Sequence, residues 1–345
     1  MAPSGHNTPR GSIVTSVVAP GEYIHFDLRS QILKELLNSC YMTSDLSDLQ
    51  LDIHTDRCAL DKSGCIHVWP IQCRIANLPN SKPIVVSVYK GKQKPSDSNI
   101  FFKKLITDIG CLISSGGITF NSSTVPITVR NFIADAPARA FVLNHAGHES
   151  FKPCSKCTIR SVKADGRTAF TGVDHSLRTD DEYVRCADEQ HHKGVSPLSL
   201  IPMGLVSQVP FEYMHIVCRG DMKKLFSAWV HGKYTRSTKL SRRQIELMSS
   251  RMHILCKYCP SDFARRPRPI QVYLKYKATE FRQFLLYTGP VVTFGVLNEE
   301  VHYQVAILRS LSEDLLFAAN NYMGQLLILI IFMNSCISPM MLDVL

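Results

Sequence analysis

The fold of this chain is decided around the stretch Asn131-Phe132-Ile133-Ala134-Asp135-Ala136-Pro137-Ala138-Arg139. A β-branched run, Ile127-Thr128-Val129, leads into it, and Ala136-Pro137 suits the first turn of a helix. Asp135 therefore lies where a core strand is expected to give way to a helix. A metal-dependent enzyme uses a carboxylate held at such a sheet edge, whereas the structural alternative is an Asp that only N-caps the helix.

Strands and helices are expected to alternate on both sides of this stretch. Hydrophobic alternation and periodicity predict strands at 49–54, 66–71, 83–89 and 127–133, and helices at 22–37, 98–113 and 136–145. This order is typical of an α/β fold. Asp56 follows the first of the four strands and Asp135 follows the last. If these strands are neighbours the two carboxylates converge, and because like charges repel, a divalent cation between them is expected.

The remainder of the chain is expected to be less regular and then helical. Residues 154–215 read as an insertion with little regular structure, followed by helices at 222–232, 241–255 (with Ser241 as N-cap) and 273–287. The predicted organisation is a disordered leader (1–20), the first part of the core (21–150), the insertion (151–235), a helical part (236–300) and an apolar helical tail (301–345).

Bulk composition favours a folded protein with a polyanionic partner. The 345 residues are 45% hydrophobic and 20% charged, which excludes a disordered chain. The formal net charge of +10 favours nucleic acid, because Lys and Arg gain affinity by releasing phosphate counterions. The chain opens without a signal-peptide pattern, and its 12 scattered Cys indicate a reducing compartment with mostly free thiols.

The C-terminal residues are unusually apolar. Residues 315–342 carry no charge, but Asn320, Asn321, Gln325, Asn334 and Pro339 interrupt the run. A buried core helix is the preferred interpretation, and a membrane helix, which needs roughly 20 apolar residues, is the alternative. We expect these residues to be an incomplete or altered end of a longer protein.

Cys154-Ser155-Lys156-Cys157 has the spacing of half a zinc site, because two thiolates on a tight turn can share one tetrahedral ion. His191, His192 and His215 are candidates for the other ligands. Two free thiols on a surface turn are the structural alternative. A thioredoxin-like redox pair is disfavoured by the Gly- and His-rich sequence that follows.

Two further groups of charged residues have a functional interpretation, and ordinary solvent-exposed charges are the alternative for both. Glu280 lies on a predicted helix beside Lys277, where an ordinary solvated Glu–Lys pair is the alternative to a functional acid. Arg265, Arg266 and Arg268 lie in a Pro-broken loop that suits phosphate contact, with an ordinary exposed loop as the alternative.

Taken in order, these pieces resemble transposases of the CACTA (En/Spm-like) class, of the invertebrate type. The resemblance covers about residues 21–297. It is carried by His54-Thr55-Asp56, Val68-Trp69-Pro70-Ile71, Ile133-Ala134-Asp135-Ala136-Pro137-Ala138-Arg139, Cys154-Ser155-Lys156-Cys157, Tyr213-Met214-His215 and Lys277-Ala278-Thr279-Glu280-Phe281-Arg282-Gln283-Phe284-Leu285-Leu286-Tyr287.

The resemblance implies an RNase H-like core, interrupted by an insertion between the second and third acids of a DDE triad. Asp56, Asp135 and Glu280 would be these acids and would hold two Mg²⁺ or Mn²⁺ ions about 3.5 to 4 Å apart for phosphoryl transfer on DNA.

The resemblance also implies a zinc knuckle and DNA contacts. Cys154 and Cys157 match the knuckle, His215 falls where a zinc-associated His is expected, and His192 is taken as a further zinc ligand. Arg139 would contact a DNA phosphate. The resemblance further implies that the partner is transposon-end DNA, that the protein is a possible homo-oligomer and that it is located in the nucleus.

The chain departs from the family pattern at several points. Arg57 stands where the family usually has Gly after its first Asp, and Asp52 and Asp61 lie close enough that the choice of Asp56 depends on the alignment to Trp69-Pro70-Ile71. Both ends are short for the family. An active strand transferase is therefore weighed against an inactive relic that binds DNA or protein, and against a membrane-associated protein anchored by its C-terminal run.

Overall fold

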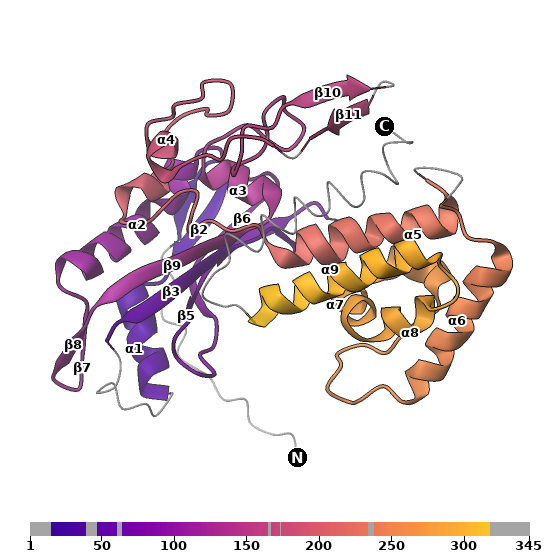
Figure 1. Cartoon of the computed structure of the whole chain (residues 1–345). Helices are drawn as coiled ribbons and strands as arrows, with labels where there is room; N and C mark the ends of the chain where they lie inside the picture. Colours follow the sequence, from indigo (N-terminus) through magenta and orange to yellow (C-terminus); the bar gives the residue numbers. More distant parts are fainter. Residues whose placement is uncertain are drawn as a thin grey trace, which may run out of the picture. The chain divides into compact units, whose positions relative to one another are not determined.

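The chain forms two compact units, each built from separated segments. The computed structural model describes residues 15–38, 47–60, 64–164, 167–172, 174–233 and 238–317. Unit 1 comprises residues up to 148 together with 178–209, and unit 2 comprises 149–177 together with 210 onward. The chain therefore leaves unit 1, returns to it and leaves again (Figure 1).

Unit 1 is built on a mixed β-sheet. Within the described residues the sheet has seven strands in the order β1-β2-β6-β5-β3-β9, with β4 paired to β5. Neighbouring strands are antiparallel except β3 and β9, which are parallel. The strands are β1 (Ser16–Val18), β2 (Gly21–His25), β3 (Leu49–Thr55), β4 (Cys58–Ala59), β5 (His67–Ile75), β6 (Ile84–Gly91) and β9 (Ile127–Ala134). A separate hairpin, β7 (Ile118–Phe120) and β8 (Ser123–Val125), precedes β9.

Helices bury the apolar faces of this sheet. In β3 the side chains alternate between buried and half-buried positions, as expected for a strand with one face toward a core. α1 (Leu28–Asn38) packs on β6 and on α2 (Ser98–Ser114), and α2 also packs on β9 and on α3 (Ala136–Val142). Asp97 N-caps α2, whose buried face includes Phe101, Phe102 and Leu105. α4 (Asp180–Val184) lies in the segment that returns to unit 1.

A β-bulge sets the register between β3 and β9. Leu51 lies opposite Val129, but Asp52 lies opposite Asn131, so Arg130 is the additional residue. From there the pairing runs in register to Thr55 opposite Ala134. Because one residue of slip turns a side chain to the other face, the bulge decides which residues of the two strand ends meet.

The returning segment of unit 1 covers the outer edge of β9. The Gln208 side-chain amide donates to Val129 O over 2.6 Å and to Arg130 O over 3.1 Å, beside the bulge. The Phe132 amide donates to Gln208 O over 2.8 Å. Gln208 thereby satisfies backbone groups that an edge strand with a bulge would otherwise leave without partners.

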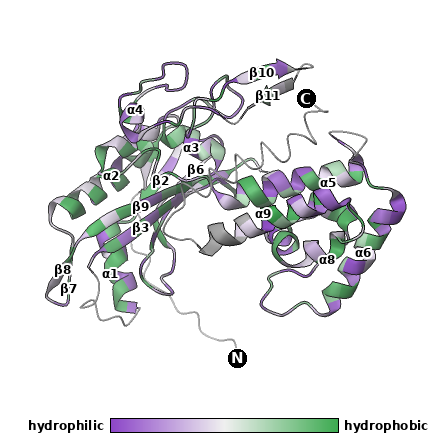
Figure 2. Cartoon of the chain, viewed as in Figure 1, coloured by the Kyte–Doolittle hydropathy of each residue, from purple (hydrophilic) through white to green (hydrophobic). Residues whose placement is uncertain are grey.

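Within the described residues, unit 2 combines helices with one hairpin and an irregular segment around that hairpin. Its elements are β10 (Ser161–Ala164), β11 (Arg167–Phe170), α5 (Met222–His231), α6 (Arg242–Lys257), α7 (Ala278–Gln283), α8 (Gly289–Thr293) and α9 (Glu299–Phe317). Polar and apolar residues interleave along α5 and α6, as in amphipathic helices with one buried face (Figure 2). The shared core includes Met222, Phe226, Trp229, Met248, Tyr273, Phe281 and Phe284.

Most strand predictions and several helix predictions are confirmed. The four predicted strands correspond to β3, β5, β6 and β9, with the second extending to Ile75. The helices predicted at 98–113, 222–232 and 241–255 correspond to α2, α5 and α6, and Ser241 caps α6 through its hydroxyl. The α/β class is therefore correct.

The predicted helix at 22–37 was wrong in its first part. Residues Gly21–His25 form β2, which pairs with β6, and the helix begins only at Leu28. The predicted leader 1–20 was also wrong in its last part, because Ser16–Val18 pairs with β2. Sheet pairing outweighed a local helical pattern at Gly21–His25, and it also ordered Ser16–Val18 within the predicted leader. Residues 1–14 lie outside the described part.

The single helix predicted at 273–287 is three segments. A 3₁₀ turn (Ile270–Lys275) is followed by extended Tyr276, then by α7 and by a π-helical stretch (Phe284–Thr288). The break arises because the Glu280 carboxylate accepts the Lys277 amide over 2.8 Å, which starts a new helix there. The helix predicted at 136–145 ends at Val142, and the insertion contains β10, β11 and α4.

The apolar C-terminal run lies largely beyond Phe317 and so outside the described residues. Among the helices that are described, none combines the length and apolarity needed to cross a bilayer.

Candidate functional site

Asp56 and Asp135 lie at the same edge of the sheet, at the carboxyl ends of two adjacent parallel strands. Thr55 is paired with Ala134, and the same register continued by one residue sets Asp56 opposite Asp135. Neighbouring strands are about 4.8 Å apart, so the two carboxylates can reach one small cation. The two strand ends are therefore adjacent in unit 1, and a cation shared by their carboxylates stays a prediction.

Local structure holds each of these two carboxylates. Asp135 N-caps α3, and its Oδ1 accepts the Ala138 amide over 2.8 Å. Asp56 Oδ1 accepts the Arg57 amide over 2.6 Å. Both Asp residues are partly exposed. Since an ionised carboxylate offers about four lone-pair sites, the backbone bond to one oxygen leaves capacity for a cation.

Asp52 is distinguished from Asp56 by its position inside the strand. It is paired with Arg130, the bulge residue, whose Nε donates to Oδ1 over 2.8 Å and whose Nη2 donates to Oδ2. Asn131 Nδ2 adds a third bond, to Oδ1, over 3.2 Å. Asp52 thus stabilises the bulge rather than the strand end. Asp61 lies outside the described residues.

Glu280 is in unit 2, and its carboxylate is already engaged. It is 3% exposed. Arg268 donates from Nε to Oε1 over 2.6 Å and from Nη2 to Oε2 over 2.9 Å, and Oε2 also accepts the Lys277 amide. Such a bidentate, charge-assisted pair is strong. In this conformation Glu280 is a structural residue, and its assignment as the third acid stays a prediction.

Some of the arginines predicted to contact phosphate are exposed, and others are buried or already bonded within the protein. Arg265 and Arg266 are exposed in the loop after α6, whereas Arg268 is held by Glu280. Arg139 is 6% exposed, and its Nη1 donates to Ala134 O over 3.5 Å. Phosphate contact by Arg139 would therefore require this side chain to be uncovered.

The predicted zinc ligands come from both units. Cys154 and Cys157 are half-buried in unit 2, where the Lys156 amide donates to Cys154 Sγ over 3.3 Å. His215, also in unit 2, has Nδ1 2.6 Å from Glu212 Oε2. His192 belongs to unit 1. Within the described residues, no set of three or more His, Cys, Asp or Glu side chains is gathered as a metal site.

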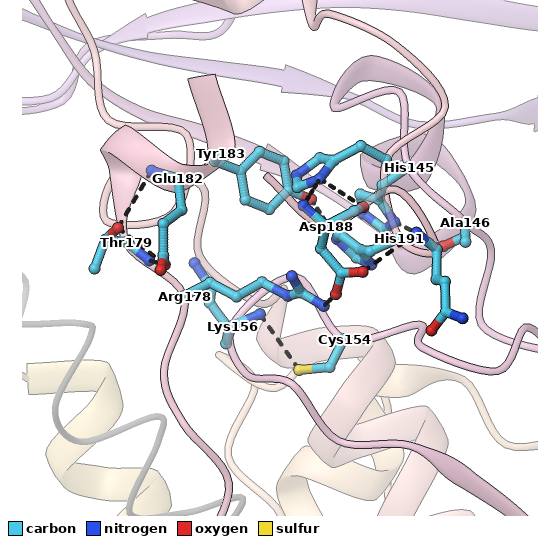
Figure 3. Close-up of polar contacts among 12 residues, drawn as sticks. His145, Ala146, Cys154, Lys156, Arg178, Thr179, Glu182, Tyr183, Asp188 and His191 are labelled. Atoms are coloured by element: carbon cyan, nitrogen blue, oxygen red, sulfur yellow. Dashed lines mark hydrogen bonds and ion pairs between the residues drawn. The ribbon is translucent and has the colours of Figure 1, made fainter. Parts of the chain in front are cut away.

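A cluster of buried imidazoles in unit 1 includes His145, which sequence reasoning missed. His145 and His191 stack with ring centroids 4.6 Å apart, and Tyr183 hydroxyl lies 2.9 Å from His191 Nε2 (Figure 3). Burial lowers the pKa of His145 to about 3 and also lowers the pKa of His192. No periodicity or motif spacing singles out His145, so only its tertiary neighbours reveal it.

In two of these rings Nδ1 lies close to a backbone oxygen, and His192 Nδ1 is also 3.3 Å from the Asp188 amide nitrogen, which can donate to it. The Nδ1 of His145 lies 2.7 Å from Ala146 O, and the Nδ1 of His192 lies 3.0 Å from Asp188 O. The Nε2 atom of each ring is buried without a hydrogen-bond partner in the described structure. A ring that donates Nδ1–H to a carbonyl keeps a lone pair on Nε2, which is the form that binds a metal or accepts a hydrogen bond.

Unit 2 contains one buried carboxylate that the sequence did not single out. Asp221 ends a π-helical segment (Met214–Asp221) and is 9% exposed. Burial raises its pKa to about 7, with Lys224 acting in the opposite direction. Its Oδ2 has no hydrogen-bond partner among the described residues.

No family model matches the chain, and no curated protein sequence matches it.

Proposed function

We propose that the chain is a transposase-derived DNA strand transferase of the CACTA type, with an RNase H-like core in unit 1. The observation that carries the proposal is the register between β3 and β9, which brings Asp56 and Asp135 to adjacent ends of parallel strands. Ligand and catalytic sites in α/β sheets commonly lie beyond the carboxyl ends of the strands. The net charge of +10 suits a DNA partner.

The proposed chemistry is metal-assisted phosphoryl transfer. Asp56 and Asp135 offer the carboxylate oxygens that Mg²⁺ and Mn²⁺ prefer, each fixed by one backbone amide. A divalent cation held there would supply Lewis-acid stabilisation of charge on the transferring phosphoryl group. The α3 cap keeps Asp135 in one orientation, so little reorganisation would be needed when DNA binds.

A second function is favoured by the state of Glu280. With both oxygens bonded to Arg268 and one also to the Lys277 amide, Glu280 would have to exchange partners before it could act as a third acid. An inactive transposase relic that binds DNA or protein needs no such exchange. Both alternatives share the proposed fold and the proposed nuclear location.

We also propose a structural Zn²⁺ bound through Cys154 and Cys157, with His215 of the same unit as a further ligand. The Cys-x-x-Cys spacing supports it, because two thiolates on a tight turn can share one tetrahedral ion. The test is zinc content of the purified chain by elemental analysis, with cobalt substitution to read thiolate ligation. A metal-free protein, or cobalt spectra unchanged by Cys157→Ser, would remove zinc from the proposal.

The catalytic proposal is tested by DNA cleavage. The purified chain is incubated with supercoiled plasmid and with labelled duplex oligonucleotides, in Mg²⁺ or Mn²⁺. We expect nicking that Asp56→Asn and Asp135→Asn each abolish. Asp27→Asn is the matched control, because Asp27 accepts the Ser30 amide ahead of α1 as Asp135 accepts the Ala138 amide ahead of α3.

The outcomes separate the two functions. Salt-sensitive DNA binding without cleavage under any metal condition would select the inactive relic. Cleavage that survives Asp135→Asn would reject the assigned site.

A further inference from the structure

A polar pocket opens in unit 1 beside α3, and neither the DDE proposal nor the zinc proposal uses it. Its volume is about 570 Å³, within the roughly 300–1,000 Å³ range of small-ligand sites. It is lined by Lys94, Ser96, Asp97, Ser98, Asn99, Pro137, Ala140, Phe141, Asn144, His145, Gly147, His148 and Lys193.

The pocket joins three segments that are distant in sequence. The residues before α2 and at its first turn form one wall, and Lys193 comes from the returning segment. Pro137, Ala140 and Phe141 lie on one face of α3 and form another wall, which Asn144 extends just beyond the helix. That helix starts from Asp135, so the pocket wall and the candidate catalytic carboxylate are positioned by the same element.

The charge of the pocket favours an anion. Lys94 and Lys193 are both exposed, and neither forms an ion pair within the described residues. The opposing carboxylate is Asp97, whose Oδ1 accepts the Asn99 amide at the start of α2 over 2.7 Å. Two lysines against one capping carboxylate leave a net positive site, the charge that a phosphate group requires.

The remaining lining residues fit a nucleobase. Phe141 is half-buried, with Lys94 Nζ 5.4 Å from its ring centroid. Aromatic rings beside cationic groups are the usual platform on which proteins stack single-stranded bases. Asn99 and Asn144 offer amide donors and acceptors.

We propose that this pocket binds one unpaired nucleotide of the DNA on which the Asp56–Asp135 site acts. The phosphate lies at Lys94 and Lys193, and the base lies against Phe141. A pocket of this size admits a single nucleotide and excludes a duplex, so it recognises a frayed or single-stranded end. The proposal rests on the proposed DNA function and names the form of DNA that is recognised.

The test is binding of defined DNA ends in EDTA, where no cleavage occurs. Fluorescence anisotropy compares a blunt duplex with the same duplex carrying a five-nucleotide single-stranded tail. We expect the wild-type chain to prefer the tailed DNA by about tenfold, in line with stacking of one base. Lys94→Glu/Lys193→Glu should abolish that preference.

Two controls keep the result interpretable. Lys103→Glu changes an exposed lysine of α2 that does not line the pocket, and it should retain the preference. Phe141→Leu should reduce the preference for the tail, since it removes the ring but keeps an apolar side chain. Thermal unfolding of each variant verifies that it is folded.

The outcomes also separate this inference from the catalytic proposal. Equal wild-type affinity for tailed and blunt DNA, or a preference that survives the double lysine variant, would overturn the pocket assignment whether or not the chain cleaves DNA. A tail preference that Asp56→Asn/Asp135→Asn retains and the lysine variant loses would support the pocket, even if cleavage is never observed.

Discussion

At the scale of single residues, Asp135 has the N-cap role that the sequence offered as the alternative to a metal ligand, and the metal role stays a proposal. It caps α3 through Oδ1, and it also lies at the strand end opposite Asp56. A cap requires a hydrogen-bond acceptor, whereas a cation requires charge. Asn preserves the first and removes the second, so the two roles can be separated by substitution.

We predict that Asp135→Ala lowers the free energy of unfolding by about 1 kcal/mol, while Asp135→Asn changes it little. The reason is that Asn keeps an oxygen for the Ala138 amide. Urea unfolding monitored by fluorescence measures both. Asp27→Ala provides the comparison at the equivalent position before α1. If Asp135→Asn and Asp135→Ala lowered the free energy of unfolding equally, the capping role would be contradicted.

The Glu280–Arg268 pair leads to a second prediction at this scale. Glu280 is buried, whereas the Arg268 side chain is 38% exposed, so solvent screens the pair on one side. We expect Glu280→Ala to destabilise unit 2 by roughly 1–3 kcal/mol, because it also removes the Lys277 cap. Arg268→Met should cost less. A double-mutant cycle measured by urea unfolding gives the coupling, and a coupling near zero would show that the pair is not stabilising.

At the scale of elements, the β3–β9 ladder depends on its bulge and on Gln208. The bulge was invisible in the sequence, because Arg130 reads as one more residue of an alternating strand. Its ion pair with Asp52 and the Gln208 bonds to Val129 O and Arg130 O are long-range contacts. The sequence predicted both strands and both carboxylates, but not the pairing that brings them into register.

Gln208→Leu should destabilise unit 1 by about 1–3 kcal/mol, because it leaves backbone carbonyls of β9 without their donor. Hydrogen exchange at the amides of β9, together with urea unfolding, measures the effect. Gln190→Leu is the matched control, since Gln190 is exposed. If both variants were equally stable, the edge contact would contribute nothing to the ladder.

The segment predicted as one helix at 273–287 is a second lesson at this scale. Its apolar residues do face a core, but Glu280 starts α7 by capping Lys277, and Tyr276 is extended. The apolar pattern predicted which residues are buried, but it did not predict that Glu280 caps a new helix while its carboxylate is held by Arg268 from a separate loop.

At the scale of the whole molecule, the two units contain buried titratable groups with opposite pH responses. In unit 1, neutral His145 has a folded-state pKa of about 3, well below the ordinary 6.5, because of burial and neighbouring His191. Its unfolded form binds the additional proton, so unit 1 loses stability as pH falls below 6.5. In unit 2, Asp221 has a folded-state pKa raised to about 7, so its stabilisation is lost as pH rises toward and through 7.

We therefore predict that acidification from pH 7 to 5 lowers the stability of unit 1 and raises that of unit 2. Each group contributes at most about 1.4 kcal/mol per pH unit. The chain has 2 Trp, one in each unit, so Trp229→Phe isolates Trp69 and Trp69→Phe isolates Trp229 as fluorescence probes. His145→Gln and Asp221→Asn should flatten the respective pH profiles. If the two probes reported the same change of stability with pH, the prediction would be contradicted.

The sequence alone determined the α/β class, the four principal strands and the position of Asp56 and Asp135 after two of them, because these features depend on local hydrophobic alternation and helix-start residues. Only the tertiary structure decided the register that sets the two carboxylates opposite each other, the ion pair that engages Glu280, and the burial of His145 and Asp221. Each of these depends on contacts between residues far apart in the chain, and local periodicity does not predict which distant residues are in contact.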